Sequence, residues 1–375
     1  MKKKICILQN GLARGGTDTF VVNLCKGLNP DIYDIIVINP SNKPESIIHE
    51  PEIQALGVRV IHTSPLYLGI KSKIKHLYML FQILKKEKVD IFQTNIDLFN
   101  GPQLFIAWIA RVPIRCCHSH NSMQQRALVE GKNWKIILYQ YLMRWMCWTF
   151  SNRRTGCSES AMDFLFRKRK WQQQKYPSII NNGIDINLFR KPIDIDNKRN
   201  ELNLKAKYHI ITIGHIIPQK NPIFIADVFS QLSKQRSDVD LIWIGSGEKK
   251  SVCEQIFKKN NCLSRVHFLD TRSDINEILQ CCDLFFFPSA FEGLGIVVIE
   301  AQASGLQCLV SDKIPQESNC GAVMYMSLEE PLNKWVQTLT DMLDKKITMS
   351  TKEESIQKFS IEHMVKQMEE VFKKN

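Results

Sequence analysis

Two carboxylates stand eight positions apart in the second half of this chain, in a setting where carboxylates commonly bind ligands. Glu292 opens the sequence Glu-Gly-Leu-Gly, and Glu300 lies in the apolar run that follows. Residues 283–288 have the continuous apolar pattern of a buried parallel strand that ends at a proline. Residues 296–304 are typical of a helix that ends at a glycine. The sequence therefore predicts strand, loop and helix, with one carboxylate in the loop where open α/β sheets bind ligands.

A single glutamate at a helix start is more often a cap or a partner of the helix dipole than a ligand contact. Here the whole pattern from Glu292, Glu-Gly-x-Gly-x-x-x-x-Glu-Ala-x-Ala-x-Gly, resembles the donor-site signature of family-4 glycosyltransferases. The resemblance implies an α/β protein of the GT-B fold, with two Rossmann-like domains facing a central cleft. It implies that Glu292 binds the donor sugar and Glu300 the ribose hydroxyls. The loop residues that would line the donor are Gly293, Leu294 and Gly295.

The loop at residues 10–18 carries a pair of glycines, Gly15 and Gly16, before a helix that is expected to begin at Thr19. Backbone N–H groups at a helix N-terminus can bind an anion, although an ordinary β–α turn has the same composition. The loop lacks the Gly-x-Gly-x-x-Gly fingerprint of dinucleotide-binding folds, which argues against NAD. The resemblance places both glycines near the donor phosphates and the acceptor. Thr17-Asp18 stands where the family often has Ala-Glu.

Two histidines, His118 and His120, alternate at the end of an expected strand, so their side chains point to the same side. A single histidine is most often structural, but the family has a histidine here, near the transferred sugar. We take His120 as the catalytic candidate and His118 as the second choice. With the family roles of Lys220 and Glu292, the expected catalytic residues are His120, Lys220 and Glu292.

The sequence Gly214-His-Ile-Ile-Pro-Gln-Lys220 resembles the family's Gly-Arg-x-x-x-x-Lys, whose cations hold the diphosphate of the leaving nucleotide. Cleavage of a glycosyl–phosphate bond builds negative charge, which fixed cations stabilise. Lys220 is present, whereas His215 replaces the arginine and its bidentate fork. By the same resemblance, Gly245 and Gly247 approach the nucleotide, and Arg272 lies where the base is held.

Two tandem series of strand-like and helix-like segments predict two Rossmann-like domains. The first strands are expected at residues 5–9, 35–39, 59–61, 91–94 and 114–118, and the second at 210–214, 240–245, 266–269, 284–288 and 308–311. The expected domains are an acceptor-binding domain at residues 1–181 and a domain that binds the nucleotide-sugar donor at residues 182–358. A C-terminal helix at 359–375 is expected to cross back to the first domain, and a linker is expected at 181–199.

Composition excludes a disordered chain, because 44% of the 375 residues are hydrophobic. No secretory signal is expected at the N-terminus, and no C-x-x-C pair occurs among the twelve cysteines, so buried free thiols are expected in a reducing cytosol. The net charge of +12 resides in the first half: residues 1–180 carry 26 basic and 12 acidic side chains, and residues 181–375 carry 24 and 26. Such a surface attracts nucleic acid or anionic lipid, or only solubilises the protein.

Residues 134–150 are rich in aromatics and are followed by the basic cluster at residues 167–170. Seventeen residues with two internal cations make a poor transmembrane span but suit a helix at a membrane interface. A core helix of the first domain is the alternative, and both roles are compatible.

The function expected from the resemblance is retaining, metal-independent transfer of a hexosyl or N-acetylhexosaminyl group, without a cofactor. The donor is a nucleotide-sugar, expected to be a UDP-sugar, and the acceptor a polyprenyl-diphosphate-linked saccharide of bacterial capsule, exopolysaccharide or O-antigen synthesis. The enzyme is expected in the cytoplasm, at the inner face of an anionic membrane.

Three other functions were weighed. A nucleotide-sugar epimerase of the same fold would use first-domain carboxylates, for which Asp97 and Glu130 are the candidates. A metal-dependent transferase would need Asp-x-Asp at a strand end, whereas Asp194-Ile-Asp196 lies in the expected linker. A nucleic-acid-binding protein has the charge in its favour but no recognised motif, so nucleic acid is not an expected partner.

Overall fold

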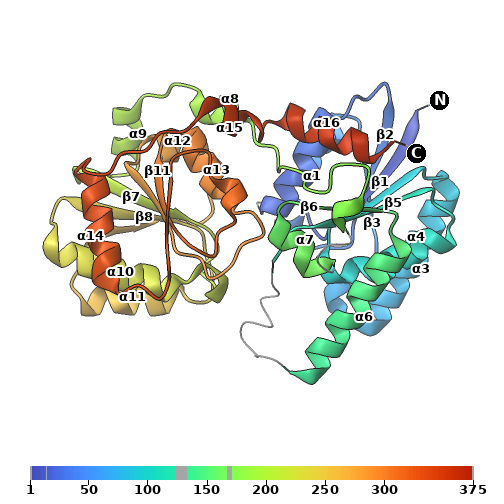
Figure 1. Cartoon of the computed structure of the whole chain (residues 1–375), viewed down its shortest axis with the longest axis horizontal. Helices are drawn as coiled ribbons and strands as arrows, with labels where there is room; N and C mark the ends of the chain where they lie inside the picture. The colour runs from blue at the N-terminus through green and yellow to red at the C-terminus, as the bar shows by residue number, and fades with distance from the viewer. Residues whose placement is uncertain (1, 14, 123–132, 167–170, 374–375) are drawn as a thin grey trace. The chain divides into compact units, whose positions relative to one another are not determined.

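The computed structural model describes residues 2–13, 15–122, 133–166 and 171–373. The chain divides into two compact units: Met1–Ile184 with Phe359–Asn375, and Asp185–Lys358. Each unit contains one six-stranded parallel sheet with helices on both faces (Figure 1). The sequence placed the two divisions after residues 181 and 358.

The sheet of the first unit has the strand order β3-β2-β1-β4-β5-β6, and all neighbouring strands are parallel. Its central strands read as unbroken apolar runs because both faces are covered. The strands are β1 (Lys3–Leu8), β2 (Tyr33–Asn39), β3 (Arg59–His62), β4 (Ile91–Thr94), β5 (Ile114–Ser119) and β6 (Arg153–Gly156). The helices are α1 (Gly16–Gly27), α2 (Glu50–Ala55), α3 (Ile70–Glu87), α4 (Asn100–Ile109), α6 (Trp134–Phe150), α7 (Glu159–Leu165) and α16 (Ile361–Val371).

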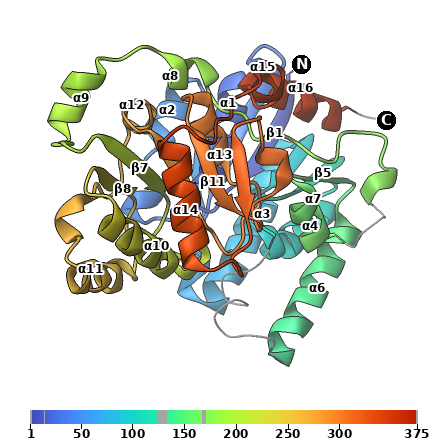
Figure 2. The ribbon, with the colours of Figure 1, turned by 60° about the vertical axis from the view of Figure 1, so that its left-hand side comes forward.

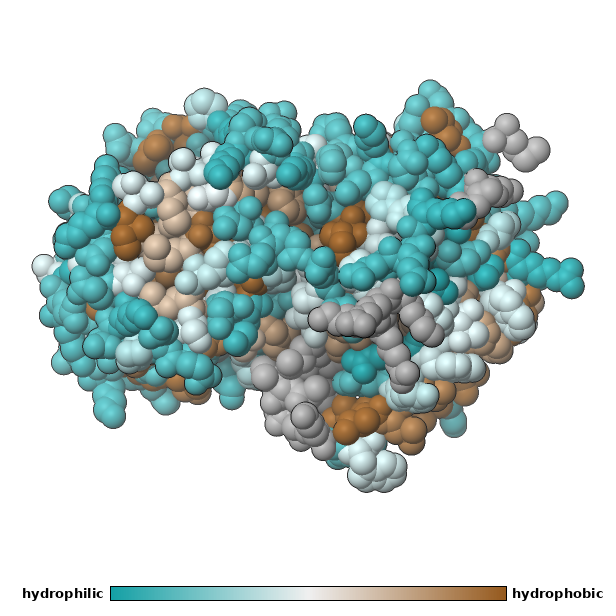
Figure 3. All heavy atoms as spheres, in the orientation of Figure 1, coloured by the Kyte–Doolittle hydropathy of each residue, from teal (hydrophilic) through white to brown (hydrophobic). Residues whose placement is uncertain are grey.

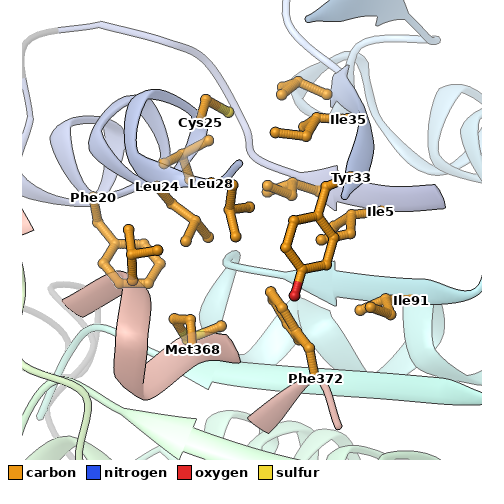
Figure 4. Close-up of a cluster of buried hydrophobic side chains, with 14 of the residues drawn as sticks. Ile5, Phe20, Leu24, Cys25, Leu28, Tyr33, Ile35, Ile91, Met368 and Phe372 are labelled. Carbon is orange, nitrogen blue, oxygen red and sulfur yellow. The ribbon is translucent and has the colours of Figure 1, made fainter. Parts of the chain in front are cut away.

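Different helices cover the two faces of this sheet. One face packs against α1, α2 and α16, and the other packs against α3, α4, α6 and α7. Figure 4 shows the first of these cores, where Phe20 and Leu24 of α1 meet Met368 and Phe372 from the C-terminal segment. Figures 1 and 2 both draw α16 beside α1, and the two helices are in contact. The C-terminal helix is therefore part of the first unit's core.

The sheet of the second unit has the order β12-β11-β10-β7-β8-β9, again parallel throughout. The strands are β7 (Tyr208–Ile213), β8 (Val239–Ile244), β9 (Val266–Phe268), β10 (Leu284–Phe287), β11 (Gln307–Ser311) and β12 (Val323–Met326). The helices are α8 (Ile186–Arg190), α9 (Ile195–Glu201), α10 (Pro222–Gln235), α11 (Lys250–Lys259), α12 (Ile275–Gln280), α13 (Ile296–Ala303), α14 (Leu332–Leu343) and α15 (Glu353–Gln357). Helices α10, α11 and α14 share one buried core with β7, β8 and β10.

Three features differ from the pattern expected from the sequence. The last strand of each sheet was not predicted, because β6 reads Arg-Arg-Thr-Gly and β12 is a four-residue edge strand. The expected linker contains α8 and α9, whose N-caps are Asp185 and Asp194. Helix α1 begins at Gly16 rather than at Thr19 because the Asp18 carboxylate accepts a hydrogen bond from the Gly15 N–H.

All twelve cysteines are buried free thiols, which confirms the expectation of no disulfide framework. The expected helix at residues 134–150 is α6, with the predicted bounds. The C-terminal stretch is divided into α15 and α16, and the Ser360 hydroxyl caps α16. Within the described ranges, none of the helices combines the length and the apolar character that crossing a membrane requires.

Candidate functional site

The loops after β7 and β10 meet at the carboxyl edge of the second sheet because these two strands are neighbours. Lys220 ends the first loop, in the short 3₁₀ helix η5 (Pro218–Lys220), and Glu292 lies in the second. The Lys220 Nζ lies 2.5 Å from the Glu292 Oε1. The same Nζ lies 4.9 Å from the centroid of the Phe287 ring, on which it is positioned by a cation–π contact. Two residues predicted from separate motifs therefore form one ion pair.

Two side chains beside Lys220 hold these loops together. The Gln219 carbonyl accepts from the Ala290 N–H at 2.8 Å, and the Gln219 Nε2 donates to the Phe291 carbonyl at 3.3 Å. The Asn221 Nδ2 donates to the Pro288 carbonyl at 3.2 Å. Sequence reasoning missed both residues, although their positions on either side of the predicted lysine were a signal. The ion pair is thus fixed by backbone contacts before any ligand binds.

The two carboxylates that began the sequence argument have different surroundings. Glu292 is buried and paired with Lys220. Glu300 lies in α13, and within the described part of the chain its carboxylate has no hydrogen-bond or ion-pair partner. Burial raises the Glu300 pKa to about 7. A half-buried carboxylate of this kind can accept hydrogen bonds from the hydroxyl groups of a ligand.

Gly295 is the N-cap of α13 and adopts a left-handed conformation, with φ +78°. Only glycine takes up this conformation without strain. Gly295 turns the chain from the loop after β10 into α13, so that Glu292 lies before the turn and Glu300 lies within the helix. Gly293 and Leu294, the residues between, are buried.

Gly245 and Gly247 have a structural reason to be glycine that the sequence did not suggest. A Cβ at Gly245 would lie 2.1 Å from the Gly214 carbonyl oxygen, and one at Gly247 would lie 2.6 Å from the Ile216 carbonyl oxygen. These glycines let the loop after β8 lie against the loop after β7, and the Ile216 N–H donates to the Ser246 carbonyl at 2.9 Å. Their first role is therefore to support the Lys220 loop.

The two remaining basic candidates of this unit lie differently. His215 is exposed, on the loop that also carries Lys220. The Arg272 guanidinium donates to both Asp274 oxygens, at 2.8 and 2.6 Å, and lies 3.5 Å from Glu201. That ion pair holds the Asp274 pKa well below its usual range. A ligand contact by the Arg272 side chain would compete with these bonds.

The histidine pair lies at the carboxyl edge of the first sheet, buried under α1. The ring centroids of His118 and His120 are 4.4 Å apart, and the Phe20 ring stacks on His118 at 4.6 Å. The His118 Nδ1 lies 2.7 Å from the Thr155 Oγ1, and the His120 Nε2 lies 3.1 Å from the Asn95 Oδ1. Burial lowers the His120 pKa to about 3 and puts the His118 pKa well below its usual range. Both rings are therefore neutral at pH 7.

The glycine loop of the first unit is organised by Asp18. Its carboxylate accepts from the Gly15 N–H at 3.1 Å and from the Gln9 Nε2 at 2.7 Å. Burial raises the Asp18 pKa to about 6, against the lowering effect of these bonds. Asp18 is thus committed to the start of α1, where Gly16 is the first helical residue.

Several other sequence candidates are also located. The Asp97 carboxylate accepts from the His120 N–H at 3.3 Å and from the Asn121 side chain at 2.5 Å, so it supports the histidine loop. Asp194 caps α9, accepting from the Asn197 N–H. Glu130 and the basic cluster at residues 167–170 lie outside the described residues. The described residues contain no group of three or more His, Cys, Asp or Glu side chains that could hold a metal ion.

Comparison with known proteins agrees with this architecture. Residues 14–188 match the model described as Glycosyltransferase Family 4, and residues 194–318 match the one described as Glycosyl transferases group 1. The two matches divide the chain where the two sheets divide it. Together the two matches cover most of the chain, which is a glycosyltransferase of the family-4 type with the GT-B fold.

Individual relatives cover most of the chain. EpsF of Bacillus subtilis (strain 168), named as a glycosyltransferase, is 28% identical over 90% of this chain and 87% of its own. The UDP-Gal:alpha-D-GlcNAc-diphosphoundecaprenol alpha-1,3-galactosyltransferase of Escherichia coli is 27% identical over 75% of this chain and 72% of its own. The crystal structure of Anabaena HepE in complex with UDP-glucose has a TM-score of 0.78 at 20% identity and covers 98% of both chains. The last similarity shows the fold.

Proposed function

We propose that this enzyme transfers a hexosyl or N-acetylhexosaminyl group, with retention and without a metal, from a UDP-sugar to a polyprenyl-diphosphate-linked saccharide. The observation that carries the proposal is the Lys220–Glu292 ion pair at the carboxyl edge of the second sheet, followed by α13 with Glu300, whose carboxylate has no partner among the described residues. A cation and two acceptors on these loops and on the helix that follows match a nucleotide diphosphate, a sugar and a ribose.

Each group has a separate part in the proposed reaction. The Lys220 ammonium would stabilise the charge that develops on the departing diphosphate, a part that a divalent cation plays in metal-dependent enzymes. Glu292 would accept from donor-sugar hydroxyls and Glu300 from the ribose hydroxyls. The acceptor would attack on the face of the sugar from which the phosphate leaves, so the departing phosphate oxygen could take the acceptor's proton and donor and product sugar would share one anomeric configuration. The E. coli relative, whose name gives a UDP-galactose donor and a diphosphoundecaprenol acceptor, supports both substrate classes.

The proposed membrane association rests on an apolar stripe of exposed side chains on α6. They recur at helical spacing and are Trp134, Ile137, Leu138, Tyr141, Leu142 and Trp145. Helix α6 packs on α4 and contains no acidic residue, and Lys135 lies within the stripe. Figure 3 shows hydrophobic side chains gathered where Figure 1 draws α4 and α6.

An exposed apolar surface of this extent usually marks an interaction site. Aromatic residues beside cations favour the interface of an anionic membrane. We therefore propose a cytoplasmic enzyme held peripherally at the inner membrane face, where a lipid-linked acceptor is presented.

The donor proposal is tested by thermal shift of the purified protein with UDP, GDP, ADP and their common sugars. We expect stabilisation by the uridine compounds, and its loss in Glu300→Ala. The shift should persist in the presence of EDTA. Stabilisation by GDP or ADP compounds instead would reject the UDP assignment, and donor binding or turnover that requires Mg²⁺ would reject the metal-independent mechanism.

The membrane proposal is tested by sedimentation with vesicles of phosphatidylcholine containing phosphatidylglycerol. The variant Trp134→Ser/Leu138→Ser/Tyr141→Ser should bind these vesicles at least about tenfold less well, because apolar burial at the interface is lost. A matched control changes exposed apolar residues of the second unit, Leu188→Ser/Ile223→Ser. Equal loss in both variants would show that the α6 stripe is not the contact surface. Donor-induced stabilisation should be the same in all three proteins.

A further inference from the structure

The amide of Asn95 lies between two strand ends of the first sheet, directly after β4. Its Nδ2 donates to the Leu8 carbonyl at 3.3 Å. Its Oδ1 lies 3.1 Å from the Gln93 Nε2 and 3.1 Å from the His120 Nε2. Asn95 is 3% exposed, so these protein groups are its surroundings.

These contacts fix which way the amide points. A carbonyl oxygen cannot donate, so the group facing Leu8 must be the Asn95 NH₂, and Oδ1 must face the other way. The Gln93 Nε2 supplies a donor to the same Oδ1, as this orientation requires. A reversed amide would place two oxygens together at Leu8 and two NH₂ groups together at Gln93.

The fixed amide in turn determines the proton position on His120. An Oδ1 at 3.1 Å can only accept, so the His120 Nε2 must carry the hydrogen. Burial keeps the ring neutral, with the pKa lowered to about 3. A neutral imidazole has one N–H, so the Nδ1 has a free lone pair. In the described part of the chain, no group donates to that Nδ1.

We propose that Asn95 is a positioning residue that holds His120 in the Nε2–H tautomer, so that Nδ1 is presented as a hydrogen-bond acceptor. The inference rests on the proposed function and on the role that the family resemblance predicts for His120, near the transferred sugar. It also defines what His120 contacts: a group that donates, such as a sugar hydroxyl or the N–H of an acetamido group. A phosphate oxygen or a carbonyl is excluded as the partner of Nδ1.

The ring plane is set by other contacts, which separates positioning from packing. The Phe20 ring meets His120 edge-on at 5.2 Å and stacks on His118. His118 has its own partner, the Thr155 hydroxyl. Loss of the Asn95 acceptor should therefore leave the His120 ring in place and change only the position of its proton.

The test is NMR of protein labelled with ¹⁵N-histidine, in which long-range correlations distinguish the protonated ring nitrogen from the bare one. The His120 signals are assigned by their absence in His120→Gln. Wild type should show hydrogen on Nε2. Hydrogen on Nδ1 in wild type would overturn the proposal, and this outcome needs no variant to fold.

Two substitutions at position 95 complete the test. Asn95→Leu removes the acceptor at similar volume, and the proton should move to Nδ1. Asn95→Asp retains an acceptor oxygen and should keep the Nε2–H form. Thr155→Val is the matched control, since it removes a histidine partner next door, and it should leave the His120 tautomer unchanged. An unchanged tautomer in Asn95→Leu would also overturn the proposal.

Kinetics separate this inference from the proposed function. In Asn95→Leu, kcat for sugar transfer should fall about tenfold with KM for the UDP-sugar within about threefold, because the wrong nitrogen faces the substrate. If wild type has the Nε2–H form but His120→Gln transfers sugar at the normal rate, the tautomer assignment stands and the catalytic role of His120 fails. If wild type has hydrogen on Nδ1 and His120→Gln transfers sugar slowly, the catalytic role of His120 stands and the tautomer assignment fails.

Discussion

The carboxyl edges of the two sheets carry polar groups of opposite electrostatic character. In the second unit, a lysine and a glutamate form an ion pair at 2.5 Å, and the following helix carries Glu300, for which the described residues provide no partner. In the first unit, the corresponding edge carries two neutral histidines held by an asparagine, a threonine and an aromatic ring. Both sites are built at the same place in the same kind of fold.

Under the proposed function, the difference follows from what each edge would bind. A nucleotide diphosphate brings charge, and the leaving group gains more of it during transfer, so fixed ions are effective there. A sugar hydroxyl is neutral, and a neutral acceptor of defined direction can bind it without attracting a counterion. The proposed function would therefore use charge in the second unit and the positions of single protons in the first.

The largest effect is expected from removing the cation. Lys220→Met should lower sugar transfer by about 10²–10³-fold, because the charge on the leaving diphosphate is no longer stabilised. Glu292→Gln, which keeps the size of the side chain, should lower it by at least about 10²-fold. The measurement is UDP release from the UDP-sugar in the presence of acceptor, with a melting curve for each variant.

Lys250→Met is the matched control for that experiment. Lys250 also pairs with a carboxylate of the same unit, Asp270 at 3.0 Å, but on the surface, where such pairs contribute little. Its rate should stay within about twofold of wild type. Near-normal sugar transfer by Lys220→Met would show that the second unit does not act through the charge of this lysine.

A smaller effect is expected from the neutral edge. His120→Ala should lower transfer by about 10–10²-fold, with little change in UDP-sugar binding, because only one neutral hydrogen bond to the sugar is lost. The pKa of about 3 means that His120 should contribute no inflection to the pH–rate profile between pH 5 and 8. His62→Ala, at a partly exposed histidine of the same unit, is the control. A wild-type inflection near pH 6.5 that disappears in His120→Ala would show that the site is not neutral.

Glu300 should make ligand binding at the second sheet depend on pH near 7, where His120 of the first unit does not titrate. Its pKa is raised from 4.5 to about 7, so the carboxylate is protonated below pH 7 and ionised above it. Affinity for a UDP-sugar should therefore rise about tenfold from pH 6 to pH 8, as the acceptor for the ribose hydroxyls ionises. Calorimetric titration with a UDP-sugar measures this affinity. A UDP-sugar is suitable because its diphosphate is esterified at both ends and does not change protonation between pH 6 and pH 8.

The sign of the effect can be checked on the protein alone. Because the folded-state pKa lies above that of the unfolded chain, the Glu300 contribution to the unfolding free energy is fully present below pH 4.5 and is lost as the pH rises through 7. In Glu300→Gln, this pH-dependent contribution to the unfolding free energy and the pH dependence of UDP-sugar affinity should both disappear. An affinity slope that persists in Glu300→Gln would assign it to another group.

How far the sequence predicted these sites depended on the kind of signal. The central strands and the carboxylate loop were predictable because buried parallel strands are continuous apolar runs and glycines mark the turns between them. Lys220 and Glu292 came from two separate motifs, and only the adjacency of β7 and β10 brings them together. The edge strand β6 was missed because Arg-Arg-Thr-Gly has no apolar pattern.

The supporting residues were missed for a different reason. Gln219, Asn221 and Asn95 act through hydrogen bonds to backbone groups that are distant in sequence. Their types are common in loops, so composition gives no reason to select them. Likewise, the structural role of Gly245 and Gly247 could not be predicted, because the sequence does not reveal that another loop occupies the space of their missing side chains.

The smallest effect on activity, and a direct comparison of the two glycine loops, is expected from alanine substitutions. At Gly247, a Cβ would lie 2.6 Å from the Ile216 carbonyl oxygen, and backbone cannot move aside cheaply. At Gly15, the nearest atom is the Asp18 Oδ2 at 3.0 Å, the end of a flexible side chain, and φ is −109°. Gly247→Ala should therefore lower the unfolding free energy by about 2 kcal/mol or more, and Gly15→Ala by less than about 1 kcal/mol.

Chemical denaturation of both variants measures this difference, and Gly15→Ala is the matched control, because neither glycine has a positive φ and only the atom that the new Cβ would meet differs. If Gly247→Ala costs no more than Gly15→Ala, the loop after β8 does not support the Lys220 loop, and Gly247 is a glycine for the sake of a ligand instead. In that case Gly247→Ala should fold normally and lose UDP-sugar binding, so one pair of measurements assigns the role of this glycine.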